Sequence, residues 1–489
     1  MKQKLSTNIG LNFQNSYLSL PSVIMSKISP EPVRAPELVV FNNSFAKELD
    51  LTPSDISDEN LAKIFSGNVL PKGSESVAFA YAGHQFGFFT ILGDGRAVLL
   101  GEHNTKNNKK YEIQLKGSGK TPYSRQGDGR AAFGPVLREY IVSEAMYGLG
   151  IPTTRCLAVV KTGERVFREG PLPGAILTRV ASSYVRVGTF QYAAAKKDTK
   201  TLRALTDYVI KKHFDGLIES KKAALDLLSL VIKKQIDLVV SWMGVGFVHG
   251  VLNTDNVAVS GETIDYGPCA FLDSYSKDAV FSSIDRTGRY SYGNQPIITH
   301  WNLLRFAEAL LPLIHPDQKT AVKMASGVFE NFDSEFKKRW MSMMLKKIGI
   351  LDEREGDSVL LQNLLNWMQK NKSDFTNTFV FLTTGQGFGD EKFKQKDFLE
   401  WKESWEKRLF NSSKEVDYKN LMEKNNPKII PRNNVVENVL YEATENNNTL
   451  PFLDFLKKLN NPYGSGVGKS VYQTPPKDGG LNYKTFCGT

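Results

Sequence analysis

A polar loop in the middle of the chain carries side chains that could bind a metal ion and accept a proton. Residues 249–256 read H-G-V-L-N-T-D-N, and a D-Y-G triplet begins at Asp265. Carboxylate and amide oxygens, completed by phosphate oxygens, are ligands that Mg²⁺ prefers, so Asn256 and Asp265 are candidate metal ligands. Asp255 is the carboxylate of the loop that could take a proton from a hydroxyl group. Alternatively, these residues only shape the turns of the loop, and the loop alone does not decide between the two interpretations.

The elements around this loop could bring the polar side chains together. The apolar run 227–243 predicts a buried helix before the loop, and residues 257–260 and 263–267 predict a hairpin after it. Protein kinases build a metal site from a loop asparagine and the aspartate of a D-F-G triplet in the same order. In the kinase pattern H-R-D-L-x-x-x-N, however, Val251 occupies the position of the catalytic aspartate, and valine cannot accept a proton.

A lysine and an arginine upstream of the loop could bind phosphate groups. Residues 86–102 predict a hairpin with a G-D-G turn at 93–95, whose tip can approach a ligand closely. Arg96 follows the turn directly, although glycine turns are also common in hairpins without a ligand. Lys116 ends a further predicted strand, 111–116, as the phosphate-binding lysine of kinases does.

A helix predicted over 135–149 offers two carboxylates that could orient Lys116. Proline at its first position and regularly spaced apolar residues favour this helix. Glu139 and Glu144 both lie on it, and the spacing does not choose between them. Most helix glutamates are solvent-exposed and have no such partner, so both could simply be surface residues.

Two arginines downstream of this helix could also bind phosphate. Arg179 lies on a strand predicted over 175–180, and Arg186 follows it. Guanidinium groups form forked hydrogen bonds with phosphate oxygens. Because surface arginines are common, the pair alone does not predict a phosphate site. The prediction depends on the other candidate residues.

Two further segments look like P-loops but lack part of the motif. Residues 117–121 read G-S-G-K-T, but Gln114 stands where G-x-x-x-x-G-K-[ST] needs its first glycine, and Pro122 opposes the helix that should follow. Residues 468–470 read G-K-S, with Tyr463 at the glycine position. We reject both segments as P-loops.

The composition is typical of a globular protein. The 489 residues are 41% hydrophobic and 23% charged, enough for two or three packed units. The formal net charge of +10 arises from interspersed basic and acidic residues, so we expect no nucleic-acid partner. We see no secretory signal or membrane-spanning run, and three widely spaced cysteines suit a reducing compartment. We therefore expect a cytoplasmic protein with no membrane partner, and a monomer.

The order of predicted elements indicates the fold class. A strand-rich half is followed, from about residue 202, by a mostly helical half. This order predicts an α+β protein with a protein-kinase-like, two-lobed fold. We expect an N-terminal extension over 1–80 that wraps a strand-rich lobe over 81–190. A helical lobe over 191–489 would then carry the catalytic loop, the metal-binding segment and a C-terminal extension.

Several long motifs together resemble the SelO (selenoprotein O, or YdiU) family. They are Y-A-G-H-Q-F-G at 81–87, Q-L-K-G-S-G at 114–119, the loop at 249–256, T-I-D-Y-G-P at 263–268, F-S-S-I-D at 281–285 and N-Q-P at 294–296. The similarity covers nearly the whole chain, and motifs of this length are highly specific.

The resemblance implies an activity. SelO proteins are kinase-fold pseudokinases that transfer AMP, instead of phosphate, from ATP to Ser, Thr or Tyr hydroxyl groups of proteins. It implies that ATP binds in a flipped orientation that presents its α-phosphate to the acceptor. It further implies ATP as co-substrate, Mg²⁺ or Mn²⁺ as cofactor, and proteins as partners. The valine at position 251 is then a feature of the family.

The resemblance also implies roles for individual residues. Asp255 would be the base, and Asn256 and Asp265 would bind the metal. Lys116 would pair with Glu139, which settles the choice that the spacing left open. The residues implied in nucleotide binding are Gly93, Gly95, Arg96, Lys116, Asp128, Gly129, Glu139, Arg179, Arg186 and Asp265.

The end of the chain reads T-F-C-G-T and places Cys487 where the family carries a cysteine or a selenocysteine. We hypothesise that Cys487 pairs with Cys269, shortly after Asp265, and ties the tail to the active site. Two free thiols are the alternative, because disulfides are rare in the cytosol.

Two rival functions use the same residues. Phosphoryl transfer by an ordinary kinase conflicts with Val251. A nucleotide-binding scaffold without catalysis has little need for the metal ligands Asn256 and Asp265. Oxygen ligands alone do not distinguish Mg²⁺ from Mn²⁺.

Overall fold

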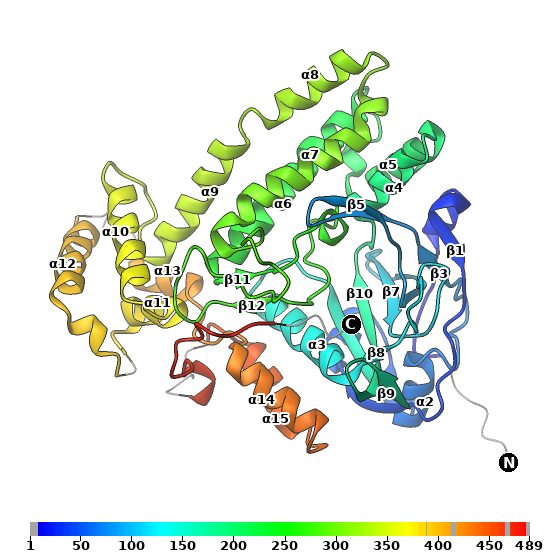
Figure 1. The fold of residues 1–489 in the computed structure, drawn as a ribbon, viewed down its shortest axis with the longest axis horizontal. Coiled ribbons are helices and arrows are strands. Elements are labelled where there is room, and N and C mark those ends of the chain that lie inside the picture. Colours follow the sequence, from blue (N-terminus) through cyan, green and yellow to red (C-terminus); the bar gives the residue numbers. More distant parts are fainter. Residues whose placement is uncertain (1–7, 388, 412–416, 465–469, 486–489) are drawn as a thin grey trace.

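The computed structural model describes residues 8–387, 389–411, 417–464 and 470–485. Figure 1 shows a strand-rich part built from the first half of the chain, with long helices from the second half extending away from it. The predicted α+β class is therefore confirmed. Within the described ranges, no helix combines the length and apolar character needed to cross a bilayer.

One antiparallel sheet forms the centre of the strand-rich part. Its strands follow the order β1-β3-β6-β7-β10-β9-β2, and β8 pairs with β10. Residues before position 80 supply three of these strands. The strands are β1 (Met25–Lys27), β2 (Glu37–Phe41), β3 (Val77–Phe79), β6 (Ala97–Asn104), β7 (Lys110–Lys116), β8 (Ala131–Ala132), β9 (Arg155–Phe167) and β10 (Pro171–Ala181).

The register between β7 and β10 aligns polar residues inside the sheet. Gln114 lies opposite Arg179, and Lys116 lies two residues further along β7. Residues two apart on a strand, and residues directly opposite on its neighbour, point to the same face. Lys116, Gln114 and Arg179 therefore share one face of the sheet. The alternate residues Ile113 and Leu115 are fully buried on the other face.

Helices cover both faces of this sheet. α1 (Asn43–Glu48) and α2 (Asp58–Phe65) pack into the same apolar cluster as Ile113 and Leu115. α3 (Phe133–Gly148) packs against β9 and β10 on the opposite face, beside Leu177. The face that bears Lys116 is thus the face that α3 covers.

The hairpin predicted over 86–102 is wrong. β5 (Phe88–Ile91) pairs with β4 (Ala82–Gln85) in a separate two-stranded ribbon, whereas β6 pairs with β3 and β7. The ribbon turns at Phe86 and Gly87, whose φ angles are 52° and 91°. Phenylalanine rarely adopts this conformation, but the Phe86 N–H lies within hydrogen-bonding distance of Asn253 Oδ1 and Tyr290 Oη. Contacts with residues far away in the sequence thus fix a turn that the local sequence does not predict.

The second half of the chain is largely helical, as predicted. α6 (Ala223–Gly244) leads through β11 (Phe247–Val248) into the loop at 249–256. β12 (Ala270–Phe271) pairs with β11 after the loop. The other helices are α4 (Val187–Ala195), α5 (Thr199–His213), α7 (Gln295–Ile314), α8 (Gln318–Phe329), α9 (Phe332–Lys347), α10 (Asp357–Lys370), α11 (Phe375–Thr384), α12 (Lys396–Phe410), α13 (Tyr418–Asn425), α14 (Asn433–Thr444) and α15 (Leu450–Leu459).

The hairpin predicted over 257–267 is also wrong. Ala258 forms an isolated bridge with Arg186, and Thr263 forms one with Thr153. The two segments therefore pair with residues from the strand-rich part instead of with each other. These bridges attach the polar loop directly to the sheet region.

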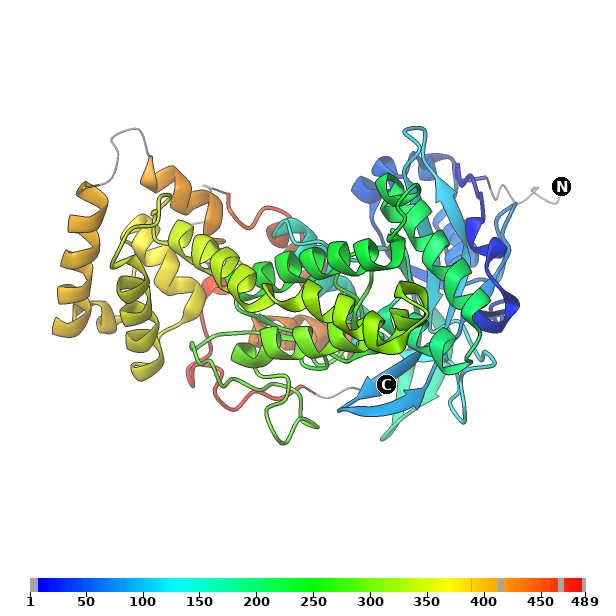
Figure 2. The same cartoon turned by 90° about the horizontal axis from the view of Figure 1, so that it is seen from above.

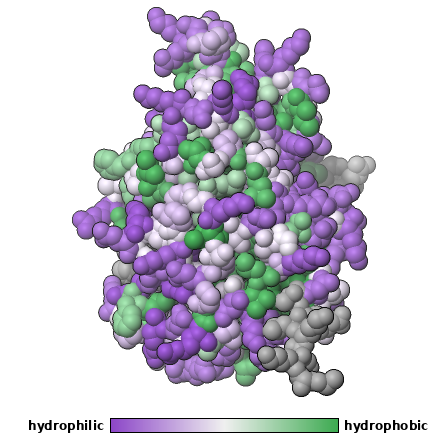
Figure 3. Space-filling view, turned by 90° about the vertical axis from the view of Figure 1, so that its right-hand side faces the viewer, coloured by the Kyte–Doolittle hydropathy of each residue, from purple (hydrophilic) through white to green (hydrophobic). Residues whose placement is uncertain are grey.

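The last helices return to the strand-rich part. α14 and α15 both pack against α3, and the rings of Tyr140 and Phe452 lie 5.8 Å apart. Figure 1 shows this pair of helices, in orange, beside α3, in cyan, although they lie far apart in the sequence. In Figure 3, which views the strand-rich end of the molecule, hydrophilic side chains predominate and apolar ones form small separate groups.

A buried ion-pair triad links the segment after Asp265 to these last helices. Arg432 is 1% exposed. Its guanidinium lies 2.5 Å from Asp273 Oδ1 and 2.8 Å from Asp374 Oδ2. Burial raises the pKa of Asp273 to about 6, against the opposing effect of Arg432. The two carboxylates therefore depend on this one arginine.

We predict that Arg432→Met lowers the free energy of unfolding by about 3–5 kcal/mol, because it leaves two buried carboxylates without their cation. The control is Lys370→Met, which removes an exposed ion pair with Asp397 and should cost less than about 1 kcal/mol. Equilibrium denaturation followed by tryptophan fluorescence measures both. Equal effects of the two substitutions would contradict the prediction.

Candidate functional site

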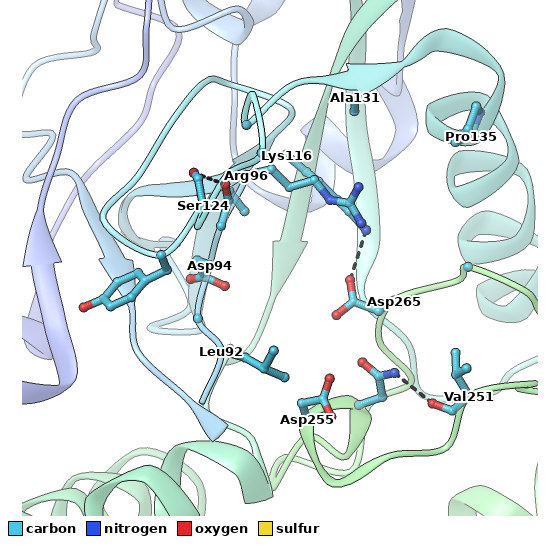
Figure 4. A pocket seen from close by; sticks show the side chains of 18 of the residues that line it. Leu92, Asp94, Arg96, Lys116, Ser124, Ala131, Pro135, Val251, Asp255 and Asp265 are labelled. Carbon is cyan, nitrogen blue, oxygen red and sulfur yellow. Dashed lines mark hydrogen bonds and ion pairs between the residues drawn. The ribbon is translucent and has the colours of Figure 1, made fainter. Parts of the chain in front are cut away.

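A cavity of about 830 Å³ lies between the sheet, α3 and the loop at 249–256. In Figure 4, Asp94, Asp255 and Asp265 come from three separate stretches of chain and surround this space, with Lys116 on its sheet side. The predicted site residues that line the cavity are Gly93, Gly95, Arg96, Lys116, Asp128, Gly129, Glu139, Arg179, Arg186, Asp255, Asn256 and Asp265.

Lys116 bridges two carboxylates at the back of the cavity. Its Nζ lies 2.6 Å from Glu139 Oε2 and 3.0 Å from Asp265 Oδ1. Glu144, the alternative that the spacing allowed, instead accepts hydrogen bonds from Arg155 at 2.9 and 2.8 Å. The two helix glutamates therefore have different partners, and Glu139 is the partner of Lys116.

Asp265 is held by three cations. Arg179 Nη1 lies 2.5 Å from its Oδ1, and Arg186 Nη1 lies 2.7 Å from its Oδ2, in addition to Lys116. Burial opposes ionisation of Asp265, but Arg179, Lys116 and Arg186 together hold the pKa of this carboxyl well below its usual value. Asp265 also has a φ of 62°, in the left-handed region that aspartate tolerates better than most residues. The three ion pairs fix it in this conformation.

Two residues that the sequence analysis did not assign complete the network. The Gln114 amide accepts a hydrogen bond from Arg179 Nη2 at 2.6 Å and donates one to Asp94 Oδ2 at 3.2 Å. Asp94 also lies 3.9 Å from Arg186. Burial raises the pKa of Asp94 to about 6, and Arg186 opposes this rise. The position of Gln114, two residues before Lys116 on a strand, was the available signal, because it places both side chains on one face.

Asp255 has an oxygen that faces no partner. It is 6% exposed, and its Oδ1 has no hydrogen-bond partner among the described residues, while Gln85 Nε2 lies 3.5 Å from its Oδ2. Burial raises the pKa of Asp255 to about 6, with Arg186 opposing. Gly83 on β4 makes room for this carboxylate, because a Cβ there would lie 2.2 Å from Asp255 Oδ1. A buried carboxylate with a free oxygen in a cavity is suited to accept a hydrogen bond or a proton from a ligand.

The β4–β5 ribbon holds the loop in place. The backbone N–H of His84 donates a 2.7 Å hydrogen bond to Thr254 Oγ1, and that of Phe86 lies 3.3 Å from Asn253 Oδ1. His249 is fully buried, and its Nε2 lies 3.0 Å from the carbonyl oxygen of Ile264. These contacts fix the loop residues that precede Asp255.

Asn256 and Asp265 have the chemistry of hard-cation ligands. The Asn256 amide nitrogen donates to the Val251 carbonyl at 2.8 Å, which leaves its oxygen available. Among the described residues, no group of three or more His, Cys, Asp or Glu side chains could hold a metal by itself. The free oxygens of Asn256 and nearby Asp255 suit Mg²⁺ or Mn²⁺. Asp265 would join them only by exchanging one of its contacts with Lys116, Arg179 or Arg186 for the metal, with phosphate oxygens completing the shell.

The glycines form a tightly packed rim. A Cβ on Gly93 would lie 2.4 Å from the Tyr123 ring, and one on Gly129, whose φ is 67°, would lie 2.0 Å from the Gly119 carbonyl oxygen. Asp128 accepts a 2.9 Å hydrogen bond from Arg168, an arginine that the sequence analysis did not consider. This bond to Arg168 is the main cause that lowers the pKa of Asp128.

The predicted pairing of Cys269 with Cys487 is outside what the structure describes, because Cys487 lies beyond the described residues. Cys269 is buried, and nearby Thr485 donates a hydrogen bond to the carbonyl oxygen of Pro268 at 2.9 Å. The described end of the chain therefore lies next to the segment that carries Asp265.

A cavity lined by a strand lysine, two buried arginines and oxygen ligands for a hard cation is typical of an enzyme that acts on nucleotide phosphates. The family model described as Protein adenylyltransferase SelO matches residues 7–460. This chain belongs to the SelO family and is a nucleotidyltransferase.

Relatives match over almost their entire lengths. A protein nucleotidyltransferase YdiU from Pelagibacter ubique is 52% identical over 485 residues, which cover 98% of this chain and 100% of the relative. One from Geobacillus kaustophilus is 52% identical over 482 residues, with 98% and 99% covered. One from Halalkalibacterium halodurans is 50% identical over 490 residues and covers both chains completely.

We predict that Gln114→Leu weakens nucleotide binding about tenfold, because Arg179 loses the acceptor that orients it and a buried donor is left unpaired. Titration with a fluorescent ATP analogue measures the affinity. The control is Gln473→Leu, which removes a buried amide bonded to the Lys428 carbonyl, outside the cavity. Unchanged affinity in the folded Gln114 variant would show that Arg179 does not depend on it.

Proposed function

We propose that this enzyme transfers AMP from ATP to Ser, Thr or Tyr hydroxyl groups of proteins and releases pyrophosphate. The observation that carries the proposal is the state of Asp255, a buried carboxylate with a free oxygen in a cavity lined by phosphate-binding cations. Val251 lines the same cavity at the position where a kinase has its base. In this proposal Asp255 accepts the proton in place of a residue at position 251. The cations Lys116, Arg179 and Arg186 all line the cavity. The words adenylyltransferase and protein nucleotidyltransferase in the family and relatives' names support this proposal.

Residues of the cavity would bind the phosphates and accept the proton during AMP transfer. Lys116, Arg179 and Arg186 would bind the phosphates and offset the charge that develops on pyrophosphate as it leaves. The acceptor hydroxyl oxygen forms a bond to the α-phosphorus, the bond from that phosphorus to the bridging oxygen breaks, and the hydroxyl proton passes to Asp255. Glu139 would keep Lys116 in position during this exchange.

Asn256 and Asp265 would hold Mg²⁺, which would supply further positive charge beside the phosphates. Mn²⁺ fits the same oxygen ligands. The rim residues Gly93, Gly95, Arg96, Asp128 and Gly129 would complete the nucleotide site.

A kinase-like, two-lobed fold is part of the same proposal. A strand lysine paired with a helix glutamate, and a polar loop followed by a D-Y-G triplet, occur in the order that kinases use. We propose the boundaries 1–80, 81–190 and 191–489 for the extension, the strand-rich lobe and the helical lobe. The cavity would then lie between the two lobes.

The test compares ATP labelled on the α-phosphate with ATP labelled on the γ-phosphate, each incubated with the enzyme, Mg²⁺ and a cell lysate. We predict that only α-label reaches protein and that EDTA abolishes the transfer. Asp255→Asn should lower the rate about 10²–10⁴-fold while nucleotide affinity is retained, because it removes the base without changing the shape of the side chain.

Asp278→Asn, at an exposed aspartate outside the cavity, is the matched control and should leave the rate unchanged. Transfer of the γ-label alone would identify a kinase. Binding of ATP without any transfer would identify a scaffold, and either result would contradict the proposal.

A further inference from the structure

A second hollow adjoins the nucleotide cavity. It shares Phe86 and Ile284 with that cavity and continues away from it across the surface. One wall is the turn of the β4–β5 ribbon, and the other is the first turns of α7. Its lining residues are Phe86, Ile284, Arg286, Thr287, Arg289, Asn294, Ile297, Ile298 and Trp301, which we call the ribbon–α7 groove.

The walls of this groove are fixed in position. The His84 ring packs edge-on against Phe89 of the ribbon at 5.3 Å and against Trp301 of α7 at 5.2 Å. The Phe86 ring packs against Tyr290 at 5.2 Å. The ribbon is therefore tied to α7 and to the loop that follows Asp285, and the groove is a built feature of the structure.

Apolar side chains of the groove and the ribbon are uncovered. Ile297 is 65% exposed and Ile284 is 55% exposed, while Phe88 on the ribbon is 78% exposed. Figure 2 shows the β4–β5 ribbon projecting from the strand-rich part. Several large apolar side chains exposed around one hollow are typical of an interaction site.

The groove contains two arginines, and the carboxylate between its lining residues Ile284 and Arg286, that of Asp285, accepts hydrogen bonds from the backbone N–H groups of Arg289 and Tyr290. Among the described residues, neither Arg286 nor Arg289 has a carboxylate within ion-pair distance, whereas nearby Arg305 pairs with Glu308 at 2.7 Å. The Arg289 guanidinium lies over the Trp301 ring at 4.8 Å, and its Nε has no hydrogen-bond partner among the described residues. Burial lowers the pKa of His84, the hydrogen bond with Gln191 opposes this, and Arg305 and Arg289 add to the lowering. A carboxylate on a ligand would supply a counter-charge for these guanidinium groups.

We propose that the ribbon–α7 groove binds the segment of the protein substrate that flanks the acceptor hydroxyl, and that it selects an acidic and an apolar residue in that segment. This inference rests on the function proposed above. An acceptor that reaches Asp255 must continue out of the nucleotide cavity, and the groove is continuous with that cavity through Phe86 and Ile284. A ligand carboxylate would pair with Arg289 and Arg286, and an apolar side chain would cover Ile297.

The groove is also coupled to the base. The Phe86 N–H contacts Asn253 two residues before Asp255, and Tyr290 donates a hydrogen bond to the same Asn253 oxygen. A peptide seated against Phe86 would therefore rest on the residues that position the catalytic loop. Binding in the groove would direct the adjacent hydroxyl towards Asp255.

The test uses synthetic peptides with one Ser, Thr or Tyr acceptor, an apolar residue, and either Glu, Gln or Lys at varied distances from the acceptor. Transfer from α-labelled ATP gives KM and kcat for each peptide. We expect the best Glu peptide to have a KM about tenfold below that of its Gln counterpart, and Arg286→Glu/Arg289→Glu to abolish this preference. The same double variant should favour the Lys peptide. Ile297→Asp should raise KM for peptides with the apolar residue.

Two matched substitutions control for charge and for surface change. Arg34→Glu reverses an exposed arginine outside both cavities, and Val359→Asp changes an exposed aliphatic residue on α10. Neither should alter peptide preference. Affinity for a fluorescent ATP analogue should remain unchanged in the groove variants, because Arg286, Arg289 and Ile297 lie outside the nucleotide cavity.

The outcomes separate this inference from the proposed function. Label transfer that is equal for Glu, Gln and Lys peptides and insensitive to the groove variants would overturn the groove proposal alone. No α-label on any peptide or lysate protein would overturn the proposed function and the groove proposal with it. If Ile297→Asp dissociates a dimer seen by sedimentation without changing any KM, the groove binds a second copy of this chain and the proposal is wrong.

Discussion

Asp265 and the three cations around it form the interaction on which the site depends. Lys116, Arg179 and Arg186 come from two strands and the start of a helix, and each is held within 3.0 Å of one carboxylate. Without Asp265, buried like charges would repel one another at short range. Removing one partner from a buried ion pair typically costs about 3–5 kcal/mol. This attraction also stabilises the left-handed backbone of Asp265 and keeps the D-Y-G segment against the sheet.

The sheet register makes that arrangement possible. The alignment of Gln114 with Arg179 puts two strands' polar residues on one face, while apolar residues fill the other. A shift of one residue would turn Gln114 and Lys116 into the apolar cluster with Ile113 and Leu115. The hydrophobic core beneath α2 therefore determines where Lys116, Gln114 and Arg179 lie.

The sequence predicted the features that depend on local periodicity or on specific motifs. The α+β class, the helix that carries Glu139, and the gathering of Lys116 and Asp255 around one cavity all follow from such signals. The choice between Glu139 and Glu144 could not be made from spacing, although five residues on a helix separate their directions by about 140°. The resemblance to the SelO family named Glu139, and the structure agrees, because Lys116 pairs with Glu139 while Arg155 of β9 binds Glu144.

The two wrong hairpins share a physical cause. In each, adjacent apolar segments suggested local pairing, but both segments found partners elsewhere in the chain. β5 pairs with β4 across a turn at Phe86 that the sequence does not predict, and Ala258 pairs with Arg186. Backbone groups at strand edges bind whatever partner the tertiary fold brings close, so local pattern alone cannot identify that partner. The sequence did not identify Gln114 and Asp94 for a similar reason. Their role depends on contacts with Arg179 and Arg186, which only the tertiary fold brings close.

The packing of α14 and α15 on α3 determines when α3 can be fully covered during synthesis. α3 carries Glu139, and its outer face is covered by residues from the far end of the chain, such as Phe452. Segments emerge from the ribosome in sequence, at about 5–20 residues per second. The sheet and the loop at 249–256 therefore emerge while the face of α3 that α14 and α15 cover is still bare. α14 can cover part of that face once residue 444 has emerged, and α15 completes the cover after residue 459, so the strand-rich part is synthesised before the helices that support α3.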